Sequence, residues 1–203
     1  MGRKKKIKKE EVKQEETVVQ GAQTINYQGS ISLSINKGKK VLLKKKYHNK
    51  GMPNLFKFLA NCLAGNYSGN LRPNKIKLFY NPDTSTSPSN WDWNTAWGDN
   101  TTKPKAVSPY ILFDTTPVVE TKENACQVTL HFRVPFSYIS GDKINIVALY
   151  QSDASDDQSQ VAAYYLLTDE NNTWDGGIDL SEVSTNYSLI VEWTLIVANK
   201  AAN

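Results

Sequence analysis

The sequence predicts a mostly β protein: an antiparallel β-sandwich of immunoglobulin-like or jelly-roll-like type, with one short helix and a basic N-terminal arm. Six to eight segments read as strands, the longest of which alternate apolar and polar residues with a period of two, whereas one segment has the apolar spacing of a helix. Aromatic residues make up 10% of the chain, and they favour sheets. The 203 residues suffice for a single domain, expected at 24–203, with the arm at 1–23.

Charge is distributed unevenly along the chain. Residues 1–50 hold 14 Lys and Arg against 4 Asp and Glu, whereas residues 51–203 hold 10 against 16, and the whole chain carries a net charge of +4. A basic first quarter on an acidic remainder indicates a polyanionic partner, or an acidic surface on a neighbouring subunit.

Lysine dominates the N-terminal arm, which reads RKKKIKKEEVKQEETVVQ over residues 3–20. Such a segment is either a solvated tail or an arm that orders against a partner. The candidate partner-binding residues are Arg3, Lys4, Lys5, Lys6, Lys8 and Lys9. Glutamates interrupt the charge and no aromatic residue accompanies it, so a groove on another protein is at least as good a target as nucleic acid, which is the alternative.

The first predicted hairpin follows the arm. Ile25, Tyr27, Ile31, Leu33 and Ile35 share one phase of a strand, residues 36–39 suit a turn, and residues 41–47 form the returning strand. A second basic cluster lies on or beside that strand: Lys39, Lys40, Lys44, Lys45 and Lys46. These lysines serve either to bind a partner or to protect an edge strand from aggregation.

One helix is predicted at residues 52–64. Pro53 suits its first turn, Gly65 suits its end, and an apolar face recurs at three- and four-residue spacing. Cys62 lies on that face and is expected to be a small core residue. With Cys126 it makes two buried thiols, which indicates a reducing compartment or no need for disulfides.

Residues 81–107 form a long polar segment that carries three tryptophans, after a strand expected at 76–80. Loops of this length within a domain are usually functional or disordered, and tryptophans argue against disorder. Trp91, Trp93 and Trp97 are therefore candidate partner-binding residues. They would fold the loop back onto the body, pack into a neighbouring subunit, or form a platform on which a sugar stacks.

The remaining segments are predicted strands at 110–113, 125–134, 143–150, 161–167 and 187–197. Strand 125–134 alternates throughout, which turns Cys126 inward and leaves His131 on the polar face. Strand 143–150 is apolar on both faces, which is typical of a central strand.

No catalytic constellation emerges, so we expect a chain that is not an enzyme and takes no cofactor. The two histidines have no metal-ligand spacing, and the chain lacks a phosphate-binding glycine loop and paired-cysteine zinc motifs. Acidic loops at 153–157 and 169–179 offer oxygen ligands for Ca²⁺, but they lack the spacing of known calcium loops and suit ordinary turns. No apolar run approaches a membrane span, so no membrane partner is expected.

The second half of the chain resembles a family in the style and order of its strands. The stretch ENACQVTLHFRVPFSYISGDKINIVALYQSD, followed by AAYYLLTD and SLIVEWTLIVAN, is similar to small β-sandwich virion proteins of tailed bacteriophages, of the crAss-like and short-tailed kinds. The resemblance covers residues 50–199. It implies a particle component assembled in the host cytoplasm, such as an auxiliary or decoration capsid protein, or a tail or connector component. Its partners would be other capsid or tail subunits.

Overall fold

The computed structural model describes residues 24–48, 50–51, 65, 72–122, 125–140, 143–152, 154, 156–181 and 186–200. They form a mostly β protein in which every strand pairing is antiparallel, as the sequence predicts. The predicted helix at 52–64 and the basic arm lie outside these residues.

The first sheet has the strand order β2–β1–β13–β8–β7. Its longest strands, the first and the last of the chain, lie side by side from the pair Thr24 and Lys200 to the pair Asn36 and Ser188. The bounds of its strands are β1 Thr24–Lys37, β2 Lys40–His48, β7 Val118–Lys122, β8 Ala125–Pro135 and β13 Ser188–Lys200.

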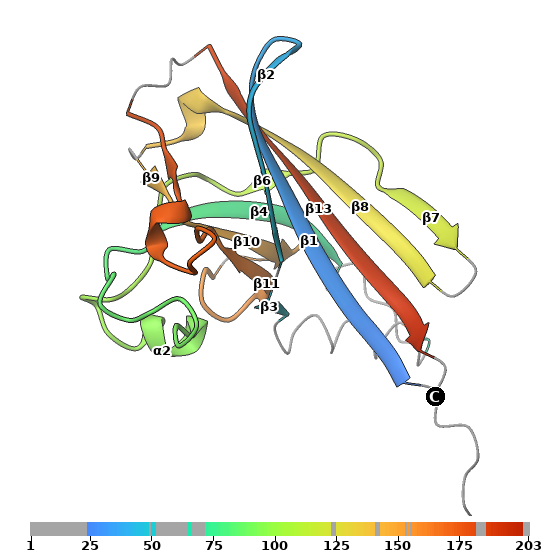
Figure 1. The fold of residues 1–203 in the computed structure, drawn as a ribbon, viewed down its shortest axis with the longest axis horizontal. Coiled ribbons are helices and arrows are strands. Elements are labelled where there is room, and N and C mark those ends of the chain that lie inside the picture. Colours follow the sequence, from blue (N-terminus) through green and yellow to red (C-terminus); the bar gives the residue numbers. More distant parts are fainter. Residues whose placement is uncertain are drawn as a thin grey trace, which may run out of the picture.

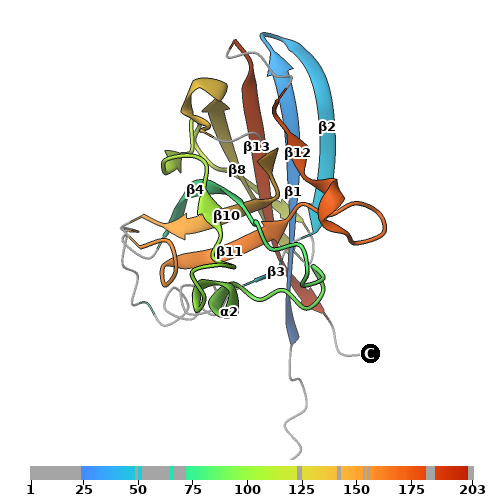
Figure 2. The same ribbon diagram turned by 90° about the vertical axis from the view of Figure 1, so that its left-hand side faces the viewer.

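The second sheet has the order β3–β11–β10–β4–β5, and β6 also pairs with β4. Its strands run crosswise to those of the first sheet (Figures 1 and 2). Their bounds are β3 Lys50–Gly51, β4 Pro73–Tyr80, β5 Lys105–Ala106, β6 Ile111–Leu112, β10 Ile146–Gln151 and β11 Val161–Leu166. A small two-stranded sheet joins β9 (Lys143–Ile144) to β12 (Ile178–Asp179).

The main core lies between the two large sheets. Trp193 of the first sheet is fully buried and meets Tyr165 of the second edge to face, with ring centroids 4.8 Å apart. Around this pair pack the inward residues of both sheets, among them Ile31, Leu33, Ile76, Leu78, Phe132, Val147, Leu149 and Val191. Alternation along each strand delivers these side chains to one face, which is why the predicted strand phases match the core.

A third layer covers the other face of the second sheet. Strand β10 is buried at all six positions because Val147 and Leu149 enter the main core while Ile146, Ala148 and Tyr150 enter a second cluster. This confirms the prediction of a central strand. The covering residues are Trp91, Trp93, Ala96, Ala154 and Trp174. The tryptophan-rich segment is thus a layer of the fold, and it contains a helix, α2 (Trp93–Trp97).

Candidate interaction surfaces

The sequence-predicted partner-binding residues fall into two groups. Arg3, Lys4, Lys5, Lys6, Lys8 and Lys9 lie outside the described residues, so their role stays a prediction. The three tryptophans of the 81–107 segment are described, and they occupy different positions.

Trp91 and Trp93 lie inside the chain, with exposed fractions of 4% and 0%. Both rings contact Tyr164 of β11, at centroid distances of 5.5 Å each. The Trp93 indole donates to the carbonyl oxygen of Gln158 at 3.0 Å. Asp92 caps the short helix by accepting from the backbone N–H of Thr95. Three roles were considered for the 81–107 segment. The buried positions of Trp91 and Trp93 fit the first of them, in which the loop folds back onto the body of the same chain.

Trp97 reaches the surface in part and lines a small pocket. The Lys103 ammonium lies 4.4 Å from the centre of its ring, which is a cation–π contact. The pocket has a volume of about 330 Å³ and is also lined by Asn100, Lys105 and Asp157. Trp97 is therefore the one of these three tryptophans with surface left for a partner.

Asp157 ties the third layer to the second sheet. It accepts from the Lys77 ammonium at 2.7 and 2.8 Å and from the Tyr110 hydroxyl at 2.7 Å. Burial, followed by this hydrogen bond, raises the pKa of Tyr110. The carboxylate is thus engaged within the fold.

The β1–β2 hairpin is the most strongly charged element among the described residues. Residues 24–48 contain six lysines and no carboxylate. The turn projects at one end of the molecule, and α2 lies at the opposite end (Figures 1 and 2). Gly38 adopts φ +60° there, a conformation that favours glycine. Exposed lysines surround the turn and continue along β2: Lys37, Lys39, Lys40, Lys44 and Lys46.

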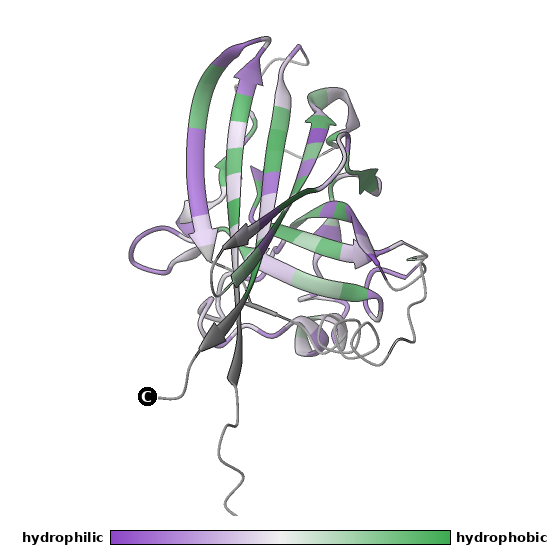
Figure 3. Ribbon diagram, turned by 90° about the vertical axis from the view of Figure 1, so that its right-hand side faces the viewer, coloured by the Kyte–Doolittle hydropathy of each residue, from purple (hydrophilic) through white to green (hydrophobic). Residues whose placement is uncertain are grey.

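Apolar side chains accompany these charges. Val41 and Leu42 are 51% and 45% exposed. In Figure 3, which is coloured by hydropathy, the edge strand β2 shows a hydrophobic (green) stretch followed by a long hydrophilic (purple) one. A projecting element with both kinds of exposed side chain is suited to contact with an acidic partner surface.

Two residues fix the base of this hairpin. Tyr47 donates its hydroxyl to the carbonyl oxygen of Gly176 at 3.0 Å, and the Lys45 ammonium donates to the same oxygen at 3.2 Å. Burial raises the pKa of Tyr47 to about 12. The exposed lysines are thus carried on an anchored strand.

The opposite margin of the first sheet is formed by β7. Val118 and Val119 of this edge strand are 55% and 62% exposed. Cys126 of the neighbouring β8 is also exposed, so the prediction of a buried thiol at this position is wrong. The reason is that the core on β8 begins at Leu130, with Val128 only partly buried, and Cys126 lies beyond it.

His131 faces the outer side of the first sheet, as predicted, and it pairs with a carboxylate. Its Nδ1 contacts Asp114, whose other oxygen lies 3.6 Å from Arg133 Nε. Asp114 also donates its backbone N–H to the carbonyl oxygen of His131. Glu192 stands opposite His131 in the register with β13. These polar and charged side chains form a partly exposed row on the outer side of the sheet.

The acidic loops make ordinary turn contacts. Asp156 accepts from the backbone N–H of Gln158 at 2.8 Å, and Asp169 accepts from that of Thr173 at 2.6 Å. These contacts lower the pKa of both carboxyls, in Asp156 mainly through Ser159. Within the part of the chain that the structure describes, no three His, Cys, Asp or Glu side chains cluster as metal ligands would.

A second pocket, between residues 84–88 and 172–175, has a volume of about 400 Å³ and was not foreseen from the sequence. In the sequence, the acidic and asparagine-rich stretch around Trp174 indicates an ordinary turn, with a Ca²⁺ loop as the alternative, and does not indicate a pocket. None of the helices in the described ranges is both long and apolar enough to cross a membrane. Comparison with known protein families, with characterised proteins and with solved structures finds no match for this chain.

Proposed function

We propose that this chain is a non-enzymatic structural protein of a virus particle, an auxiliary or decoration protein of the capsid that bridges neighbouring subunits. The observation that carries the proposal is the β1–β2 hairpin, an anchored and projecting element with six lysines and no carboxylate. An element of this kind supplies binding energy through contact with an acidic neighbour.

The position of the chain start supports the same proposal. Thr24, to which the arm is attached, lies at one end of the first sheet, and the hairpin turn lies at the other end. The start of β1 and the lysine-rich turn therefore lie at opposite ends of one sheet. An arm attached at the end opposite the basic hairpin allows one subunit to contact two neighbours, which is what bridging requires. The resemblance of residues 50–199 to small phage virion proteins supports the particle, and a place in the tail or connector is the alternative.

A sedimentation experiment tests the proposal. Particles are purified on a density gradient from a culture that produces the full chain, and the chain is quantified in the particle fraction. We expect it at a fixed copy number per particle. Reversal of Lys37, Lys39 and Lys40 to Glu should lower that occupancy about tenfold, because each exposed charge pair contributes up to about 1 kcal/mol.

The comparison variant reverses Lys103 and Lys105 to Glu, two exposed lysines that line the Trp97 pocket and lie outside the hairpin, so it tests whether the hairpin or that pocket carries the contact. If the hairpin carries the contact, their reversal should leave occupancy unchanged. Contact through the hairpin should also weaken with rising salt, because exposed charges are screened within about 8 Å at physiological ionic strength. The proposal fails if the chain remains in the soluble fraction, or if both reversals reduce occupancy equally.

A further inference from the structure

Strand β2 leaves one of its two edges without a neighbouring strand. Among the described strands it pairs with β1 alone, so the backbone groups along its other edge face no partner strand. This edge extends over Lys40–His48, and the register with β1 skips Leu42, which makes a bulge near the turn. An exposed edge of this length is a template on which another extended chain adds as a strand.

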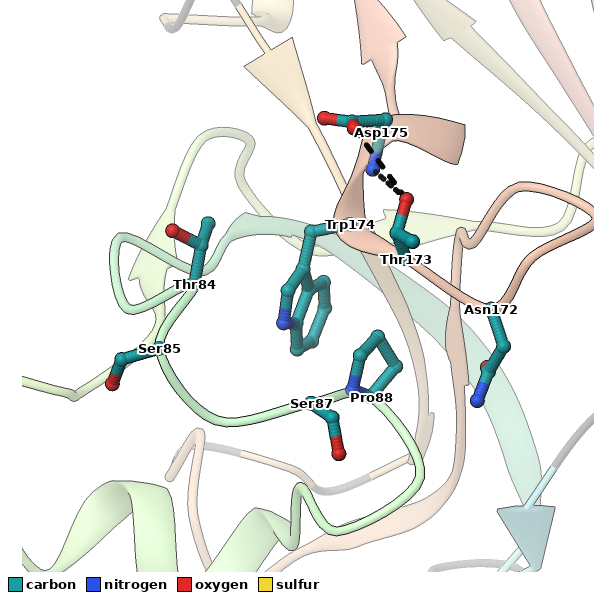
Figure 4. A pocket seen from close by; sticks show the side chains of 8 residues that line it. All are labelled: Thr84, Ser85, Ser87, Pro88, Asn172, Thr173, Trp174 and Asp175. Atoms are coloured by element: carbon teal, nitrogen blue, oxygen red, sulfur yellow. Dashed lines mark hydrogen bonds between the residues drawn. The ribbon is translucent and has the colours of Figure 1, made fainter.

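The strand is held in place from its inner side. Tyr47 and Lys45 both donate to the carbonyl oxygen of Gly176, which ends the short 3-10 helix that begins at Trp174. Figure 4 shows the ring of Trp174 pointing toward residues 84–88, where its indole N–H is bonded to a carbonyl oxygen at 2.8 Å. The edge is therefore ordered before a partner arrives, which lowers the cost of binding.

The exposed side chains of this edge restrict what can add to it. Lys44 and Lys46 are exposed, and no carboxylate lies among residues 24–48 to balance them. These lysines oppose a neutral or basic strand and so select an acidic one. Val41 and Leu42, toward the turn, are exposed as well. They favour a polypeptide with apolar side chains over nucleic acid, whose phosphates match only the lysines.

The N-terminal arm of this protein carries the required pattern. Residues 15–19 read EETVV, two carboxylates followed by three β-branched residues, which favour strands. When this segment runs antiparallel to β2 with Glu16 opposite Lys44, the preceding glutamate lies opposite the next lysine, and the two valines reach Val41 and Leu42. Opposite charges and apolar pairs directly across two strands both stabilise such a pairing.

The arm of the same chain is too short to reach this position. In the antiparallel register residue 20 lies near Lys40, which pairs with Lys37 at the turn end of β1. Thr24, at the start of β1, is about 40 Å from Lys37 along this strand of 14 residues. The chain from residue 20 to Thr24 spans at most about 14 Å. The added strand must therefore come from a second copy.

We propose that residues 15–19 of one copy add as an antiparallel strand to the free edge of β2 in a second copy. This inference rests on the proposed function, and it identifies the acidic neighbour of the hairpin as the arm of another copy of this chain. Each copy offers one arm and one edge, so the contact is head-to-tail and repeats from copy to copy. Such a contact produces a closed ring or an open row of subunits.

Sedimentation equilibrium of the full chain tests the pairing. The parent chain should associate with rising concentration, above the monomer mass of 22.8 kDa. Glu16→Lys and Lys44→Glu should each weaken association by about fivefold, because each places like charges opposite one another. The double variant should recover the parent's association. A mixture of the two single variants should recover it as well, because the charges are again opposite at every mixed interface.

Two exposed residues outside the hairpin supply matched controls. Glu120→Lys in β7 and Lys105→Glu in β5 make the same charge changes and should leave association unchanged. The inference is overturned if the chain is monomeric, if nuclease treatment abolishes association, or if the double variant and the mixture fail to recover it. If the chain is monomeric and reversal of the hairpin lysines still lowers particle occupancy, the hairpin binds a different protein, and the proposed function stands without this inference.

Discussion

Trp174 donates its indole N–H to the carbonyl oxygen of Thr86, 88 positions earlier in the chain, at 2.8 Å. The ring also meets Trp91 edge to face at a centroid distance of 6.0 Å. One side chain of the third layer therefore connects the loop after β11 to residues 84–88 and to Trp91.

Replacement of this residue should be costly. Trp174→Phe removes the donor to a partly buried carbonyl and also removes buried apolar area, so we expect the free energy of unfolding to fall by about 2–3 kcal/mol. Trp97→Phe is the control, because the Trp97 indole nitrogen is buried without a hydrogen-bond partner among the described residues. It should cost about 1 kcal/mol or less. Urea denaturation of both variants measures the difference, and equal losses would contradict the role given to the Trp174 bond.

Gly176 is required at the turn that carries the oxygen bound by Tyr47 and Lys45. A Cβ there would lie 1.8 Å from the backbone carbon of Thr168 and 2.1 Å from the nitrogen of Asp169. Gly176→Ala should therefore cost more than about 4 kcal/mol or prevent folding. Gly98→Ala, where a Cβ would lie 3.2 Å from the Thr95 oxygen, should cost about 1 kcal/mol or less. Soluble yield and thermal midpoint compare the two, and a stable Gly176→Ala would show that the backbone here can move.

The sequence is sufficient to predict most long strands because each buries one face. Predicted strand 125–134 is β8, Ala125–Pro135, and predicted strand 187–197 lies in β13, Ser188–Lys200. Alternation along a strand does not show where one sheet extends beyond the sheet that packs against it. For this reason Cys126 is exposed although it shares the inward-facing phase of β8. The short strand β7 was missed because neighbouring valines fill both of its phases.

The third layer could not be derived from periodicity either. Strand β10 is apolar on both faces, which indicates that a further layer covers the second sheet, but the pattern does not show which residues form that layer. Trp91 and Trp93 belong to that cover through contacts with Tyr164, seventy residues further along the chain, which no local pattern encodes. Likewise, the pocket around Trp174 depends on two segments that meet only in the fold.

The bridge from Lys77 to Asp157 should contribute more to stability than the surface pair of Asp114 and His131. The side chains of the first pair are 14% and 21% exposed, and those of the second are 30% and 27%. Asp157→Ala leaves both the Lys77 ammonium and the Tyr110 hydroxyl unpaired, so we expect a loss of about 2–3 kcal/mol. Asp114→Ala should cost less than about 1 kcal/mol. Chemical denaturation of the two variants tests the ranking, which is refuted if Asp114→Ala is the more destabilised.

Stability should fall at alkaline pH because buried tyrosines must ionise. Burial raises the pKa of Tyr47 and of Tyr164 from 10.0 to about 12 each. Between these values the unfolded chain has lost the protons that the folded chain still holds, so the free energy of unfolding decreases as pH rises. The contribution is complete below pH 10 and lost as pH passes through 12. Denaturation series from pH 8 to pH 12 should show this decline, and Tyr47→Phe and Tyr164→Phe should each make it shallower. Unchanged slopes in both variants would mean that other groups control alkaline unfolding.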